Sequence, residues 1–254
     1  SGSPKLPRGW LVVGYNYRKC LIGPGGLFPD SSLANLIIDG QDLSQVSLKG
    51  VYTAQFLGTP SAVPEGYKFL QNCRCILGPG VRIAGVNLFG GNFSGLDLSG
   101  ADLTDCNCSN ADFSSVNFSK AALGEGTFRN SDFSNANFSE AHLGGGDFSN
   151  STFTAAVFSK THGYHSVFDR AEMSQVSFYG VDWEYVSFTE TKLAKSTWTC
   201  PGQSWPNVCL LYNVDFTRAD LSESVFSGWN LQYSTFTDSN LTNSRFIATY
   251  GFKF

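Results

Sequence analysis

Residues 111–140 read ADFSSVNFSKAALGEGTFRNSDFSNANFSE, and every fifth residue counted from Phe113 is Phe or Leu. The same period runs from Ile83 to Trp198, where only Cys108 and Gly163 replace a large apolar residue. Two places before these positions lies a small or β-branched residue, and the residue between is mostly Asp, Asn, Ser or Thr. Because side chains alternate between the faces of an extended chain, the first and third residues of each unit point inward and the second points outward.

The last two residues of each unit are rich in Ser, Gly and Asn, which suit a turn. Each unit is therefore a very short strand followed by a corner, and it can bury its inward pair only by stacking on copies of itself. A helix is excluded, because a five-residue step rotates by about 140° on a helix and would spread the apolar side chains around it. The sequence predicts an all-β solenoid.

Three segments carry a resemblance to a known family: residues 101–105 (ADLTD), 111–115 (ADFSS) and 136–140 (ANFSE). They resemble the motif of the pentapeptide repeat family, which is roughly Ala-(Asp/Asn)-Leu-X-X. The resemblance also covers an N-terminal stretch at 28–48, and it resumes one frame over at 211–246. It implies a right-handed quadrilateral β-helix, four-sided, with four pentapeptides in each coil.

Four sides per coil mean that residues twenty apart stack, and the sequence contains such columns. Two nearly pure ladders of large side chains are Phe93, Phe113, Phe133, Phe153, Met173, Leu193 and Leu98, Phe118, Phe138, Phe158, Phe178, Trp198. At roughly 4.8 Å per coil, about ten coils would give a rod on the order of 50 Å long.

Three related excursions interrupt the repeat, and each contains an aromatic residue: Trp10, Tyr67 and Trp205. These three residues are the candidate partner-binding positions, although bracing of the open coil ends is the favoured interpretation for the first two excursions. We expect one structural domain. Its expected parts are an N-terminal cap at 1–27, a first coil at 28–56, a second excursion at 57–80, the main β-helix at 81–198, a loop insertion at 199–210, final coils at 211–246 and a C-terminal cap at 247–254.

The seven cysteines are too few for a disulfide scaffold. Cys106 and Cys108 occupy inward positions, where we expect reduced thiols that fill space. Cys200 and Cys209 bracket the loop insertion at a span that permits a disulfide. The Cys-Arg-Cys of residues 73–75 lacks the spacing of a redox or zinc motif.

One outward column contains candidate metal ligands. His142, His162 and Asp182 lie twenty residues apart, and His165 is near them in the sequence. Imidazoles at strand spacing could share a metal ion, with Asp182 or His165 completing the ligand set. Outward side chains of a ladder point parallel rather than converging, so the sequence favours a structural role for this column and predicts no cofactor.

Composition limits the class of protein. The chain has 254 residues, 42% of them hydrophobic, and a net charge of -4, so it can bury a core and is not disordered. It contains no apolar run long enough to span a membrane and no basic leader, which indicates a soluble protein without membrane insertion. Residues 1–3 look like the remnant of a removed tag, so the sequence does not indicate the cellular compartment of the protein.

We expect a rigid, non-enzymatic scaffold that binds a protein partner and does not bind nucleic acid directly. The resemblance offers an alternative, because some family members mimic double-stranded DNA, bind type II topoisomerases and protect them from quinolones. DNA carries one negative charge per ~1.7 Å, and a net charge of -4 is far below that density. A viral or cell-surface structural module is a further alternative that fits the rod equally well.

Overall fold

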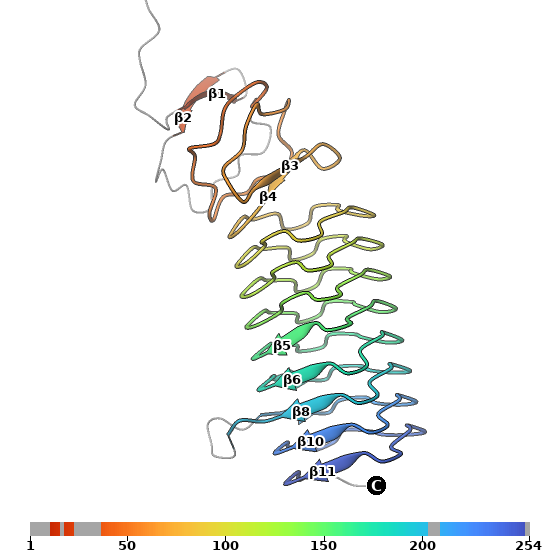
Figure 1. The fold of residues 1–254 in the computed structure, drawn as a ribbon. Coiled ribbons are helices and arrows are strands. Elements are labelled where there is room, and N and C mark those ends of the chain that lie inside the picture. The colour runs from red at the N-terminus through yellow and green to blue at the C-terminus, as the bar shows by residue number, and fades with distance from the viewer. Residues whose placement is uncertain (1–10, 16–17, 23–36, 203–208, 252–254) are drawn as a thin grey trace, which may run out of the picture.

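In the computed structural model, the chain winds into the predicted right-handed, four-sided β-helix (Figure 1). The structure describes residues 11–15, 18–22, 37–202 and 209–251, with only the backbone described before residue 37. No helix occurs among these residues, and none of them could therefore form a membrane-spanning helix.

Hydrogen bonds between successive coils hold the stack together. The amide of Phe113 donates to Asp132 O one coil further on (2.7 Å), and the amide of Asp132 donates back to Ala111 O (3.0 Å). The same exchange recurs on all four sides, with outward residues twenty apart forming parallel bridges such as Asp112 to Asp132. The twenty-residue coil predicted from the sequence is confirmed.

One side of the solenoid is more extended than the others. Its strands pair in parallel to form a five-stranded sheet: β5 (Val157–Ser159), β6 (Ser177–Tyr179), β8 (Thr197–Thr199), β10 (Val225–Ser227) and β11 (Arg245–Ile247). On another side, β7 (Trp183–Glu184) pairs in parallel with β9 (Leu211–Tyr212). The remaining strand pairings between described coils are single-residue bridges.

The corners explain why Asp and Asn recur at the outward position. Asp112 Oδ1 accepts a hydrogen bond from the amide of Ser114, two residues later (2.9 Å), and Asp132 does the same for Ser134 (2.8 Å). Such side chains mimic a turn of the backbone and orient the chain into each corner. The last residue of the unit then has a left-handed conformation, as at Lys120 (φ 61°).

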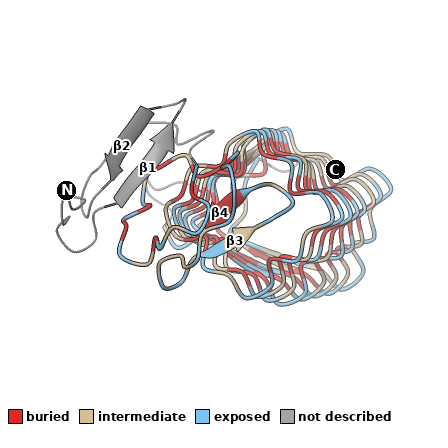
Figure 2. Ribbon diagram, turned by 90° about the horizontal axis from the view of Figure 1, so that it is seen from above, coloured by how far each residue is buried: buried red, intermediate tan, exposed pale blue. Residues whose placement is uncertain are grey.

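Stacked aromatic rings fill the interior. Phe113 and Phe133 lie parallel with ring centroids 5.3 Å apart, and Phe128 and Phe148 lie 4.8 Å apart. Seen from above, the coils follow nearly the same outline, and buried residues recur at equivalent positions of successive coils (Figure 2). Inward hydroxyls are satisfied by carbonyls of the preceding coil, as where Thr191 Oγ1 donates to Phe168 O (2.6 Å).

Two hairpins precede the regular coils. β1 (Leu11–Tyr15) pairs antiparallel with β2 (Arg18–Ile22), and β3 (Lys68–Leu70) pairs antiparallel with β4 (Cys75–Leu77). The second excursion begins later than the expected residue 57, because Ala62 still forms a bridge with Asp42 one coil before it.

The loop insertion accounts for the change of frame after Trp198. Lys192 pairs with Asp220, twenty-eight residues later, and the coils on either side of the loop stay in register. A disulfide joins Cys200 to Cys209, with Cα atoms 5.6 Å apart, so the loop is closed at its base.

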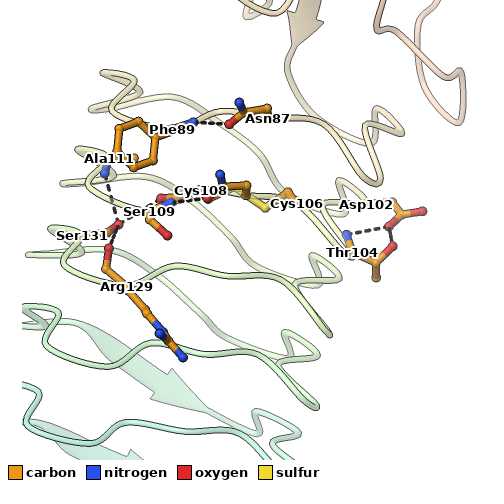
Figure 3. Close-up of a disulfide and its surroundings, with 11 residues drawn as sticks. Asn87, Phe89, Asp102, Thr104, Cys106, Cys108, Ser109, Ala111, Arg129 and Ser131 are labelled. Atoms are coloured by element: carbon orange, nitrogen blue, oxygen red, sulfur yellow. Dashed lines mark hydrogen bonds between the residues drawn. A yellow bond between two sulfur atoms is a disulfide. The ribbon is translucent and has the colours of Figure 1, made fainter.

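The expectation of reduced thiols at Cys106 and Cys108 is wrong, because a disulfide joins these residues (Figure 3). Two inward positions separated by one outward residue lie on the same face of the chain. Their Cα atoms are 5.7 Å apart, which a disulfide can span. A disulfide also joins Cys73 to Cys75, with Cα atoms 5.2 Å apart, and this bond was also not predicted.

Candidate interaction surface

Tyr67 is a brace within the β3–β4 hairpin region. Its hydroxyl donates to Pro79 O (2.9 Å), and its ring leaves no room for a Cβ at Gly78. Burial, and after it the charge of Asp97, raises the pKa of this hydroxyl. Tyr67 is only partly exposed, which supports bracing rather than partner binding. The other two candidates, Trp10 and Trp205, lie outside the described residues.

The histidine column exists, but it does not form the metal site considered from the sequence. His142 and His162 stack with ring centroids 4.9 Å apart, and His162 Nδ1 lies 3.6 Å from Asp182 Oδ2. His165 sits on a corner with a φ of 57° and stacks on Tyr185 instead. Among the described residues, no three His, Cys, Asp or Glu side chains are placed to hold a metal ion.

A column of four tyrosines runs along one corner of the C-terminal half of the solenoid. We call Tyr164, Tyr185, Tyr212 and Tyr233 the tyrosine column. Successive ring centroids are 5.5, 5.9 and 5.2 Å apart, and each ring is roughly perpendicular to the next. Tyr164 is 55% exposed and Tyr233 is 65% exposed, so the column is an aromatic ridge open to solvent.

The tyrosines alternate between two neighbouring corner positions. Tyr164 and Tyr212 directly follow the buried centre of their unit, whereas Tyr185 and Tyr233 come one residue later. In each coil the other corner position is polar: His165, Glu184, Asn213 and Gln232. We call the position directly after the buried centre the first lane of the column and the next position the second lane. Aromatic and polar side chains alternate along each lane. The column begins at Tyr164, because the same corner one coil earlier is Gly144-Gly145.

Negative charge lies within the tyrosine column. Glu184 is the register partner of Tyr212 between β7 and β9. Burial, and then the charges of Tyr185, Tyr233 and Glu184, raises the pKa of the Tyr212 hydroxyl. None of the described cations forms an ion pair with Glu184.

An open cleft of about 650 Å³ lies next to the tyrosine column and shares Glu184 with it. Pro201 and Gly202, at the base of the loop insertion, form one wall. Asp182 and Lys160 also line the cleft. The cleft and the tyrosine column together make an uneven, partly acidic surface on an otherwise regular rod.

Elsewhere, many of the described carboxylates are paired with neighbouring side chains of the protein. Ion pairs join Lys192 to Glu172 (2.6 Å) and Arg218 to Glu190 (2.7 Å). The Asp147 carboxylate pairs with Arg129. Although burial alone would raise the pKa of Asp147, hydrogen bonds from Arg129 and Ser149 lower it. These pairs break up the acidic columns that a DNA mimic would present.

The sequence reasoning missed the tyrosine column because its members do not fall in one column of the twenty-residue repeat. The separation from Tyr164 to Tyr185 is 21 residues, and that from Tyr185 to Tyr212 includes the loop insertion. A search that allowed both corner positions and the change of register after Trp198 would have found it.

Comparison with known proteins agrees with the fold. A model described as a pentapeptide repeat region matches residues 121–198. A second, described as pentapeptide repeats (8 copies), matches residues 83–119, 92–130 and 209–246. No curated protein matches the chain.

Several solved structures are similar to the chain at low identity. HetL, a pentapeptide repeat protein involved in heterocyst differentiation regulation from the cyanobacterium Nostoc sp. strain PCC 7120, is 18% identical, with a TM-score of 0.39 over 65% of this chain and 86% of that one. QnrB1, a plasmid-mediated fluoroquinolone resistance protein, is 16% identical, with a TM-score of 0.34 over 63% of this chain and 91% of that one.

The periodic core, the twenty-residue register and the two matching models, which together cover more than half of the chain, lead to one assignment. The chain belongs to the pentapeptide repeat family.

Proposed function

We propose that this protein is a non-enzymatic scaffold that binds a protein partner through the tyrosine column. The observation that carries the proposal is the unbroken contact of four tyrosine rings along one corner of a rigid stack, with Tyr212 partly exposed and the other three exposed to solvent. Exposed aromatic residues that gather on one surface are typical of protein interfaces.

Tyrosine suits this role because it offers a large contact area with only two side-chain torsions to immobilise. The backbone of the column is fixed by hydrogen bonds between coils, such as Tyr185 N to Tyr212 O (3.0 Å). A partner that contacts the column therefore loses little free energy to ordering of the scaffold.

The non-enzymatic part of the proposal rests on how the interior is used. Trp183, Trp198 and Phe153 are fully buried in continuous contact with other rings, so the space inside the coils is filled. The outward carboxylates are largely engaged in turns and surface ion pairs, which contribute about 0–1 kcal/mol each. These features serve the rod rather than a reaction.

The test is affinity capture from the source organism with three baits. They are the wild-type protein, a Tyr185→Ser/Tyr212→Ser variant and a Phe89→Ser control. Phe89 is a matched control because it is an exposed aromatic residue, 53% accessible, on a different part of the solenoid. We expect a stoichiometric protein partner that the tyrosine variant loses and the control retains. Equal capture by all three baits would overturn the proposal.

A supercoiling assay separates this proposal from DNA mimicry. The protein is added to a type II topoisomerase with and without a quinolone. Because ion pairs interrupt the acidic columns, we expect no change in supercoiling or in drug protection. Protection at stoichiometric protein would favour the DNA-mimic alternative instead.

A further inference from the structure

The two lanes of the tyrosine column have a spacing that fits one kind of peptide. Tyr164 and Tyr212 share the first lane, and Tyr185 and Tyr233 share the second, so equivalent rings recur every two coils. With strands about 4.7–4.9 Å apart, this repeat is about 9.5 Å. A polyproline II helix has three residues per turn and rises ~3.1 Å per residue, so its turn is about 9.3 Å. One face of such a helix would meet an equivalent tyrosine at every turn.

The charge in the column indicates what else the peptide carries. Glu184 lies in the first lane between Tyr164 and Tyr212, and it has no ion-pair partner among the described residues. Asp182 lines the adjoining cleft, where the described Lys160 is the only lysine or arginine. A carboxylate flanked by aromatic rings attracts a guanidinium or ammonium group, through both its charge and the ring faces.

We infer that the tyrosine column binds a basic, proline-rich segment in the polyproline II conformation. Prolines pack against the tyrosine rings, as in other aromatic-lined polyproline sites, and an Arg or Lys side chain reaches Glu184. The inference rests on the proposed function and names the chemistry of its partner.

The test uses synthetic peptides and fluorescence anisotropy with the full chain. The probe is four repeats of Pro-Pro-Arg, which places its arginines along one face of a polyproline II helix. Four repeats of Gly-Ser-Arg carry the same charge without the fixed conformation, and four repeats of Pro-Pro-Glu reverse the charge. We expect saturable binding of the Pro-Pro-Arg peptide, at least about tenfold tighter than that of either control peptide.

Variants assign the binding to the column. We expect Tyr185→Ser/Tyr212→Ser to weaken binding about tenfold, and Glu184→Gln to weaken it about threefold while reducing its dependence on salt. Phe89→Ser should bind as the wild type does. Melting curves verify that each variant is folded.

Three results would overturn the inference. They are no binding of the Pro-Pro-Arg peptide at millimolar concentration, equal binding of the Gly-Ser-Arg peptide, or binding that the tyrosine variant leaves unchanged. Binding of a neutral glucan oligosaccharide to the protein, without binding of the peptide, would identify a glycan surface instead. If captured protein still depends on Tyr185 and Tyr212 while the Pro-Pro-Arg peptide fails, the inference falls and the proposed function stands.

Discussion

Trp183 lies beside Gly163 in the same column of the core, one coil further on, and its indole fills the space that a side chain at Gly163 would need. A Cβ at Gly163 would be 2.7 Å from both Cδ1 and Nε1 of Trp183. The column is otherwise mainly aliphatic, with Leu123 and Leu143 in the preceding coils. The missing side chain at Gly163 is therefore compensated by the largest side chain in the next coil.

This relationship predicts a coupled pair of substitutions. We expect Gly163→Leu to destabilise the protein by at least about 1–3 kcal/mol through overpacking. We expect Trp183→Leu to destabilise the protein through the cavity it leaves, by less than the ~3–5 kcal/mol of a truncation to Ala. The double variant Gly163→Leu/Trp183→Leu restores an aliphatic column, and it should be more stable than Trp183→Leu alone. Denaturant unfolding of the three variants measures the coupling, which should be about 0.5–3 kcal/mol. Additive effects would show that the two residues do not compensate.

Because of Tyr67, we expect the stability of the hairpin region to fall at alkaline pH. Its raised pKa means that the folded state holds the phenolic proton to a higher pH than the unfolded chain does. The stabilisation is therefore complete below about pH 10 and is lost as the pH rises through the raised pKa. We expect Tyr67→Phe to cost about 0.5–1.5 kcal/mol near pH 7, because the bond to Pro79 O is lost. The gap from the wild type should shrink above about pH 10 in thermal melts. A gap that stays constant with pH would contradict this account.

The disulfides should differ in their access to reductant. Cys106 and Cys108 are 1% and 0% exposed. Cys200 and Cys209 are each 9% exposed, and Cys73 is partly exposed. Brief treatment of the folded protein with a thiol, followed by alkylation and mass spectrometry, should label the Cys200–Cys209 pair well before the Cys106–Cys108 pair. Loss of the bond between Cys200 and Cys209 should cost about 2–3 kcal/mol, from the entropy of the loop it closes. Labelling of Cys106 and Cys108 without reductant would contradict the disulfide between them.

Most of the fold could be predicted from the sequence because every five-residue unit has the same pattern of inward and outward residues. An inward residue such as Phe133 and an outward residue such as Asp132 are distinguished by alternation alone, and the twenty-residue register follows from stacking like on like. The excursions could not be predicted in this way. Their contacts are specific to single residues, as where Thr53 Oγ1 donates to Ile76 O in β4 (2.6 Å).

The candidate site was harder to predict for a related reason. The sequence placed His142, His162 and Asp182 in one column correctly, but His165 turned away because it occupies a corner with a left-handed backbone. The tyrosine column depends on two adjacent corner positions and on the register across the loop insertion. Neither is visible in a strict five-residue period.

The most direct test of the account places a photocrosslinking amino acid at Tyr212, in the centre of the tyrosine column, and at Phe89 as the control. The modified proteins are produced in the source organism and irradiated, and adducts are identified by mass spectrometry. We predict one dominant protein adduct from position 212 and none of that protein from position 89. No adduct at position 212, or the same adduct from both positions, would contradict the claim that this column is the partner-binding surface.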